Sequence, residues 1–385
     1  MEIDRARLLL RRGEWRAARR AFTALLTTAD DPLTRAQAAE GMAAAAWWLD
    51  DDAALTSGYE RAHRDYRRAG DLRGAARTAG WLGNAALQLA GEHAVAQGWF
   101  RRAARLLDGL PECPEHAVLA LFNAMAARLR GELGLANALA EEAVAVARRT
   151  GDPDVELQAM SVAGMALVSQ GRVASGMRLL DEAAAAALAG ETREVGAIWV
   201  PSCHLVQGCE QARDWERAKQ WSERTMAFCR SLDLGSPYAR CRTHFGTVLL
   251  WQGDWAGAER ELRQAALTLA GTRPMLAAEA WARLGELRRR QGRREEAAGC
   301  FRRGHACRAA RLGLAGLRLD EGDASTALAL AVRLLAGMRA DERLDRVPVL
   351  ELIVRAGAAV RAPTGSPSPL RLTTGSPPSS ARRSM

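Results

Sequence analysis

The sequence contains Trp281-Ala282-Arg283-Leu284-Gly285, followed by Gly292 and then by Ala297 and Phe301. The spacing is Trp-x2-Leu-Gly-x6-Gly-x4-Ala-x3-Phe, and it predicts two short helices joined by a turn. Gly285 and Ala297 carry little bulk, so the two helices can approach closely at these positions. Gly292 can adopt the left-handed backbone conformation that ends a helix. This stretch therefore predicts a helical hairpin that packs through small residues.

The same turn pattern recurs along the chain. Turns are expected at positions 13, 50, 91, 131, 171, 213, 253, 292 and 322, and a small residue usually follows five positions later. Asp50 and Arg213 replace the glycine in two degenerate copies. A hairpin cannot bury its apolar face alone, so neighbouring hairpins must stack on one another. The sequence predicts an all-α, right-handed superhelical solenoid of about nine helical hairpins over residues 1–360.

The hairpin pattern resembles the tetratricopeptide repeat, which pairs Trp-x2-Leu-Gly on one helix with Ala-x3-Phe on the next. The period here is about 40 residues, roughly six more than that repeat. We expect the additional residues to lie between units, at 110–114, 150–153, 234–237 and 271–274, where Gly and Pro occur. Gly and Pro at these places would stop one helix and start the next.

The charge is distributed unevenly. The formal net charge is +9, but residues 361–385 contain four arginines and no acidic residue. Acidic and basic residues are interspersed elsewhere, which is typical of a solvated surface rather than a nucleic-acid site. Residues 361–385 are rich in Pro, Ser and Gly and predict a disordered tail.

Several observations indicate the compartment. The seven cysteines are dispersed and form no Cys-x-x-Cys motif, which favours a reducing environment. The N-terminus has early acidic residues and lacks the apolar segment of a signal peptide. No run of about 18 apolar residues occurs, so we expect no membrane span and a cytoplasmic location.

No motif for catalysis or cofactor binding is recognisable. The phosphate-binding loop, the Gly-x-Ser-x-Gly motif and the dinucleotide fingerprint are all missing from the sequence. The most metal-like groups are Cys300, His305 and Cys307, and Cys203, His204 and Cys209. On a helix, His305 would point about 140° away from Cys300, so joint ligation is unfavourable. We therefore predict a non-enzymatic protein with no cofactor and no metal site.

The concave face of a solenoid is a natural binding surface, and the first helix of each hairpin should line it. Six polar residues that the repeat frame places there are our candidates for binding a protein, a peptide or a small effector: Gln207, Glu210, Arg240, Thr247, Glu286 and Arg289. Gln158, Ser161, Thr243 and Glu279 fall on the same face. A solvated helix face without a ligand is the alternative for each of these residues.

Some segments resemble one bacterial family more closely. They are Tyr59-Glu60-Arg61-Ala62-His63, residues 76–83, residues 170–183 and residues 210–215. Together they resemble the tetratricopeptide region of actinobacterial LuxR-type transcriptional regulators, over roughly residues 1–360. The resemblance implies the sensor or protein-interaction region of a transcriptional regulator.

The DNA-binding domain of that family is a C-terminal helix-turn-helix, whose recognition helix enters the major groove. Neither a Leu-Thr-x-Arg-Glu nor a Ser-Asn-x-Glu-Ile-Ala segment occurs in this sequence. We therefore expect DNA binding only if a helix-turn-helix is supplied elsewhere, as in a truncated or frameshifted regulator. Two further hypotheses remain: DNA binding by the Arg-rich surface or tail itself, and self-association of the array.

Overall fold

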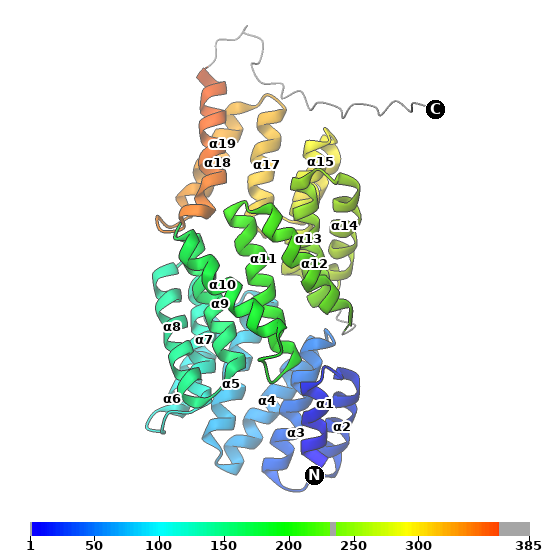
Figure 1. Ribbon diagram of the computed structural model, residues 1–385, viewed down its shortest axis with the longest axis vertical. Coiled ribbons are helices and arrows are strands. Elements are labelled where there is room, and N and C mark those ends of the chain that lie inside the picture. The colour runs from blue at the N-terminus through cyan, green and yellow to red at the C-terminus, as the bar shows by residue number, and fades with distance from the viewer. Residues whose placement is uncertain (1, 232–235, 362–385) are drawn as a thin grey trace, which may run out of the picture.

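The computed structural model describes residues 2–231 and 236–361, and every regular element in those ranges is a helix (Figure 1). The elements in chain order are α1 (Glu2–Arg11), α2 (Trp15–Thr28), α3 (Pro32–Trp48), α4 (Asp52–Ala69), α5 (Leu72–Ala85), η1 (Ala86–Ala90), α6 (His93–Leu107), α7 (Pro114–Leu129), α8 (Leu133–Thr150), α9 (Pro153–Ser169), α10 (Val173–Leu188), η2 (Val195–Ile198), α11 (Trp199–Ala212), α12 (Trp215–Ser231), α13 (Ser236–Gln252), α14 (Trp255–Ala270), α15 (Pro274–Arg290), α16 (Arg294–Arg303), α17 (Arg308–Asp320), α18 (Ala324–Ala336) and α19 (Arg343–Arg361). The predicted tail falls outside these residues, apart from Arg361, which ends α19.

Helices α1 to α18 form nine consecutive hairpins within the described residues, and α19 follows the last of them. Every predicted turn position has a positive φ, including Asp50 at 57° and Arg213 at 58°. At Gly292, the left-handed residue lets the Arg293 amide donate a hydrogen bond of 2.9 Å to the Arg288 carbonyl oxygen. The predicted all-α solenoid of about nine hairpins is confirmed.

Part of the longer period lies in the helices, so the prediction that the additional residues lie between units is wrong at 150–153, whereas residues 271–273 do form a link. Only Gly151 and Asp152 separate α8 from α9, and these helices span 18 and 17 residues. Pro153 occupies the first turn of α9, where its missing N–H leaves no helical hydrogen bond unmade. Residues 108–113 form a longer link between α6 and α7. The expected insertion at 234–237 begins in residues that lie outside the described part of the chain.

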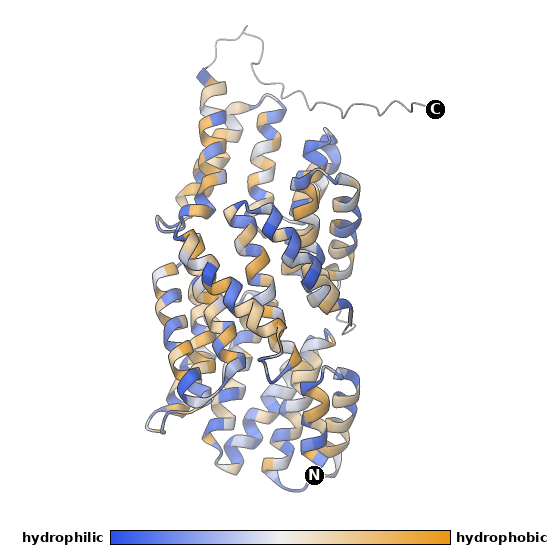
Figure 2. Ribbon diagram, viewed as in Figure 1, coloured by the Kyte–Doolittle hydropathy of each residue, from blue (hydrophilic) through white to orange (hydrophobic). Residues whose placement is uncertain are grey.

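Each second helix packs between its own first helix and the helix that follows it, and most first helices of successive hairpins also pack side by side. Small residues allow the close approach that the sequence predicts. A Cβ atom added at Gly285 would lie 2.6 Å from Cε1 of Phe301, and Ala297 is fully buried. Figure 2 shows hydrophobic and hydrophilic residues alternating along most helices, as expected for helices that bury one face.

The superhelix brings distant hairpins into contact. Arg273, just before α15, is 6 % exposed in its side chain and forms ion pairs with Asp50 and Asp52 in the second hairpin. The rings of Trp48 and Trp199 lie 6.2 Å apart. In Figure 1, α1 and α2 lie below α12 to α14, and α18 and α19 lie above α9 and α10. These contacts draw the inner face together and bury part of it.

The α18–α19 link makes a second long-range contact. An added Cβ at Gly131 would meet the Glu342 carboxylate, and Gln211 on α11 donates a hydrogen bond of 2.9 Å to Asp345 on α19. The last helix therefore packs back on the middle of the array. Among the described residues, no helix is both long and apolar enough to cross a membrane.

Candidate functional site

Polar side chains gather on the inner face of the middle hairpins. They come from first helices α7, α9, α11, α13 and α15, and we call them the inner-face cluster: Arg128, Ser161, His204, Gln207, Glu210, Arg240, His244, Glu279 and Arg283. Three of them stand at the same repeat position. His204, His244 and Arg283 each lie nine residues before the turn residue of their hairpin, Arg213, Gly253 and Gly292 respectively. The repeat itself therefore places these cationic or titratable side chains side by side.

One half of the cluster is an ion-pair network around Glu210. His244 Nδ1 lies 3.0 Å from Glu210 Oε1, and a terminal nitrogen of Arg283 lies 3.4 Å from Glu210 Oε2. The same guanidinium lies 3.5 Å from Glu279. Burial disfavours the charged imidazolium, but the Glu210 carboxylate outweighs burial and raises the pKa of His244. In this half, Arg283 pairs with both carboxylates, and His244 adds a second cation beside Glu210 when it is protonated.

The other half of the cluster is positively charged. Arg128 stands in the last turn of α7, and Arg240 stands one turn before His244 on α13. Neither guanidinium has a carboxylate within ion-pair distance among the described residues. Burial, followed by repulsion from Arg240, lowers the pKa of Arg128 to about 10. The Arg240 guanidinium lies 5.6 Å from the ring centroid of Trp199, which holds it in place.

His204 lies between the two halves. Its Nδ1 is 2.8 Å from the Ser161 hydroxyl, and the side chain is buried. Burial lowers the pKa of His204 well below its ordinary value, and the charges of Arg128 and Arg240 lower it further. His204 is therefore neutral, and its imidazole lies within electrostatic range of both arginines.

Several buried polar atoms of the cluster have no hydrogen-bond partner among the described residues. They are Arg128 Nε, Gln207 Oε1, Arg240 Nε, His244 Nε2 and Arg283 Nε. Most buried polar atoms in folded proteins are paired with protein or ordered water, so a concentration of unpaired atoms requires an explanation. Water or the polar groups of a ligand can supply these partners. Arg128, Gln207 and Arg240 remain partly accessible to solvent, so a ligand can reach them.

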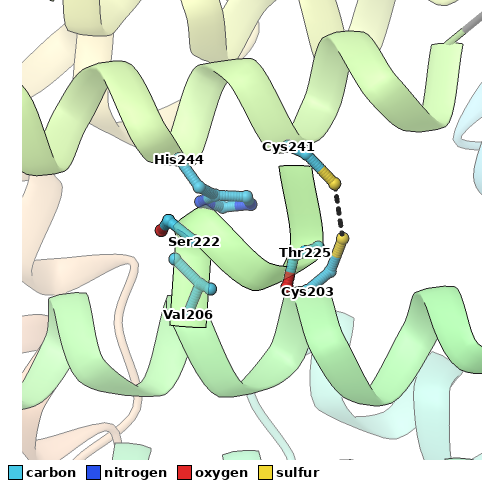
Figure 3. Close-up of a pocket in the computed structure, with 6 residues that line it drawn as sticks. All are labelled: Cys203, Val206, Ser222, Thr225, Cys241 and His244. Carbon is cyan, nitrogen blue, oxygen red and sulfur yellow. Dashed lines mark hydrogen bonds between the residues drawn. The ribbon is translucent and has the colours of Figure 1, made fainter. Parts of the chain in front are cut away.

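A small cavity adjoins the far side of His244. Figure 3 shows the residues that line it: Cys203, Val206, Ser222, Thr225, Cys241 and His244. The hydroxyls of Ser222 and Thr225 are buried and, within the described part of the chain, have no hydrogen-bond partner, and the same holds for His244 Nε2. The cavity has room for about one water molecule, and such a water would bridge these three groups.

The residues around this cavity raise the question of whether Ser222 could act as a catalytic nucleophile. A carboxylate, a histidine and a hydroxyl follow one another here, as in a catalytic triad: Glu210, His244 and Ser222. Ser222 is only 2 % exposed, however, and the cavity is too small for an acyl substrate. This arrangement therefore cannot present a nucleophile to a substrate.

Three of the six predicted site residues lie in the inner-face cluster, and the other three do not. Gln207, Glu210 and Arg240 lie in the inner-face cluster. Thr247 is buried, and its hydroxyl donates a hydrogen bond of 2.9 Å to a carbonyl oxygen of its own helix. Glu286 and Arg289 form an ion pair of 2.9 Å with each other, and Arg289 also pairs with Asp320 on α17. Arg289 thus links α15 to α17, Glu286 pairs within α15, and neither residue joins the cluster.

Sequence reasoning missed Arg128, His204, His244 and Arg283 as candidates. The repeat frame contains the signal that identifies Arg128, because Arg128 precedes its turn glycine by three residues, as Arg289 does. The equivalent positions of His204, His244 and Arg283 give a second signal. These residues could have been found by aligning all hairpins on their turns.

The cysteines form a cluster of a different kind. Cys241 Sγ lies 3.7 Å from Cys203 Sγ and 3.5 Å from Cys229 Sγ, and all three thiols are buried. Within the described residues, no group of three or more His, Cys, Asp or Glu side chains is arranged to hold a metal ion.

The fold is similar to those of solved helical-repeat proteins. No protein-family model matches the sequence, and no curated protein sequence matches it significantly. A Rap protein complexed with competence and sporulation factor superposes with a TM-score of 0.60 at 13% identity, covering 85% of this chain and 96% of that one. NprR in complex with its cognate peptide NprX gives a TM-score of 0.52 at 12% identity, covering 72% and 82%. The apo form of RapI gives 0.51 at 11% identity, covering 85% and 97%. At these identities the similarity shows the fold alone, and the structure is a tetratricopeptide-like array.

Proposed function

We propose that this protein is a non-enzymatic, tetratricopeptide-like scaffold that binds a peptide or a small effector on its inner face. The observation that carries the proposal is the inner-face cluster, where accessible polar side chains and unpaired buried polar atoms occur together. A solenoid presents its inner face as an extended binding surface. The NprR complex with its cognate peptide supports a peptide as the ligand of an array with this fold.

The biological role we propose is that of a sensor. The resemblance of residues 59–63, 76–83, 170–183 and 210–215 to LuxR-type regulators supports the sensor or protein-interaction region of a transcriptional regulator, acting in the cytoplasm. In this role, ligand binding on the inner face would be transmitted to a DNA-binding domain supplied elsewhere. The long-range contacts of Arg273 give ligand binding a means to change the curvature of the array.

The test is affinity selection with a pool of random hexapeptides, in which retained peptides are identified by mass spectrometry. Wild-type protein should retain a subset of the pool, and the retained peptides should raise its melting temperature. Gln207→Ala should weaken retention several-fold, because it removes the unpaired inner-face acceptor. Gln264→Ala, on the exposed surface of α14, is the matched control and should retain peptides as wild type does. Equal retention by the Gln207 variant and wild type would contradict the proposed site.

A further inference from the structure

We propose that the inner face recognises an anionic group of its ligand, a carboxylate or a phosphate, between Arg128 and Arg240. This inference rests on the proposed function and adds the chemical class that the site selects. Gln207 completes the site, because its partly accessible side-chain amide can exchange hydrogen bonds with an amide of the same ligand. The site therefore favours a molecule that carries an oxyanion close to an amide, as the C-terminus of a peptide does.

The charge distribution of the cluster leads to this inference. Glu210 and Glu279 already share the Arg283 guanidinium as a cationic partner, and Glu210 also contacts His244. In the part of the chain that the structure describes, Arg128 on α7 and Arg240 on α13 form no ion pair, and they lie close enough for the charge of Arg240 to lower the pKa of Arg128. The inner face therefore carries two positive charges that form no ion pair within the described residues.

Two acidic groups on other elements act on Arg128, and one of them, Glu279 on α15, forms its ion pair with Arg283 instead. Asp345 on α19 lies within electrostatic range of Arg128. Its carboxylate instead accepts a hydrogen bond of 2.9 Å from Gln211, and burial raises its pKa. The Asp345 carboxylate is thus engaged with α11, and the Arg128 guanidinium stays open to an external anion.

The two arginines are also held ready for binding. Arg240 packs against Trp199 at 5.6 Å, so its planar guanidinium has a defined position. His204, neutral and buried, packs within range of both cations without competing for an anion as a third positive charge. Guanidinium groups bind carboxylates and phosphates through two parallel hydrogen bonds, which gives geometric selectivity as well as affinity. Placing two such groups near each other is unfavourable in the empty protein and becomes favourable when an anion lies between them.

The experiment compares three pools of random hexapeptides that lack Asp and Glu. One pool has free C-terminal carboxylates, one has C-terminal amides, and one has C-terminal amides with a phosphoserine. Retention of each pool is measured by ultrafiltration and mass spectrometry on wild type, Arg128→Gln, Arg240→Gln and Arg260→Gln. Arg260 lies on the exposed surface of α14 and serves as the control for loss of one positive charge.

Wild type should retain an anionic pool at least ten-fold better than the neutral amide pool. Arg128→Gln and Arg240→Gln should each lower that retention about ten-fold, and Arg128→Lys should restore part of it. Preference for the free-acid or the phosphoserine pool identifies the anion. Circular dichroism and melting curves establish that each variant is folded.

Two results would overturn the inference in distinguishable ways. If wild type retains all three pools equally, or if the two variants retain the anionic pools as wild type does, the protein binds peptides without an anion site. If wild type retains none of the pools, peptide binding as proposed is wrong, and the anion site for a peptide falls with it.

Discussion

Replacing Arg128 by Met should stabilise the free protein, although Arg128 lies in the proposed binding site. Burial and the charge of Arg240 lower the pKa of Arg128 to about 10, so the folded state disfavours the charged guanidinium. Because the pKa is lower in the folded than in the unfolded protein, this destabilisation is fully present at neutral pH. It would be relieved only as the pH rises through the folded-state pKa and beyond. Methionine has a similar length and carries no charge.

The size of the effect follows from the pKa. A change of one unit corresponds to about 1.4 kcal/mol. Because Arg128 is partly exposed, solvent screens its charge, and we expect a gain of about 1–2 kcal/mol in the free energy of unfolding. The melting temperature should rise by about 1–4 °C. The gain should shrink in high salt, where the repulsion between Arg128 and Arg240 is screened.

The same substitution at Arg77 should have the opposite sign. Arg77 lies on α5, where its Nε is 2.6 Å from Glu40 and its terminal nitrogen is 2.6 Å from Glu115, on α3 and α7. Arg77→Met leaves two largely buried carboxylates without their cation. We expect it to destabilise the protein by about 2–4 kcal/mol. The two variants thus make the same substitution on neighbouring first helices, α7 and α5, and differ in whether the arginine has ion-pair partners among the described residues.

Urea unfolding at pH 7, followed by circular dichroism, measures both variants under identical conditions. The expected order of stability is Arg128→Met, then wild type, then Arg77→Met. If Arg128→Met were less stable than wild type by 1 kcal/mol or more, on the order of a lost hydrogen bond, Arg128 would have an internal partner. The assignment of an open cation to the inner face would then be refuted.

Three further predictions concern packing, pH and closure. Ala297→Leu should destabilise the array by about 1–3 kcal/mol through overpacking, and an unchanged melting temperature would show that this hairpin interface is wrongly placed. The Glu210 carboxylate raises the pKa of His244 in the folded protein. The stability that this pair contributes is therefore fully present below the unfolded-state pKa of about 6.5. It is lost as the pH rises through the folded-state pKa. Unfolding measured between pH 5 and pH 9 should show this loss in wild type, and Glu210→Gln should abolish it; parallel curves would exclude the pair as its source. Arg273→Ala removes the ion pairs to Asp50 and Asp52 and should destabilise the protein by about 2–4 kcal/mol. Small-angle scattering should detect a larger radius of gyration, and an unchanged radius together with an unchanged melting temperature would contradict closure through this contact.

Local patterns in the sequence determined the repeat. Each turn depends on a few neighbouring residues, so even Asp50 and Arg213, which replace glycine, were placed correctly and have positive φ. The sequence predicts the helix lengths less well, because a proline such as Pro153 is compatible both with a link and with the first turn of a helix. The sequence thus specified how many hairpins form and where they turn.

Only the tertiary structure decided which inner-face residues meet. Glu286 and Arg289 lie on a first helix as Glu210 does, yet they pair with each other within α15, and Arg289 also pairs with Asp320 on α17, so neither joins the cluster. Contacts such as Arg273 with Asp52 join residues 221 positions apart. They depend on small rotations between hairpins that accumulate along the array. No single repeat shows that rotation in its sequence, so closure of the superhelix, and with it the position of Arg128 near Arg240, appears only in the assembled fold.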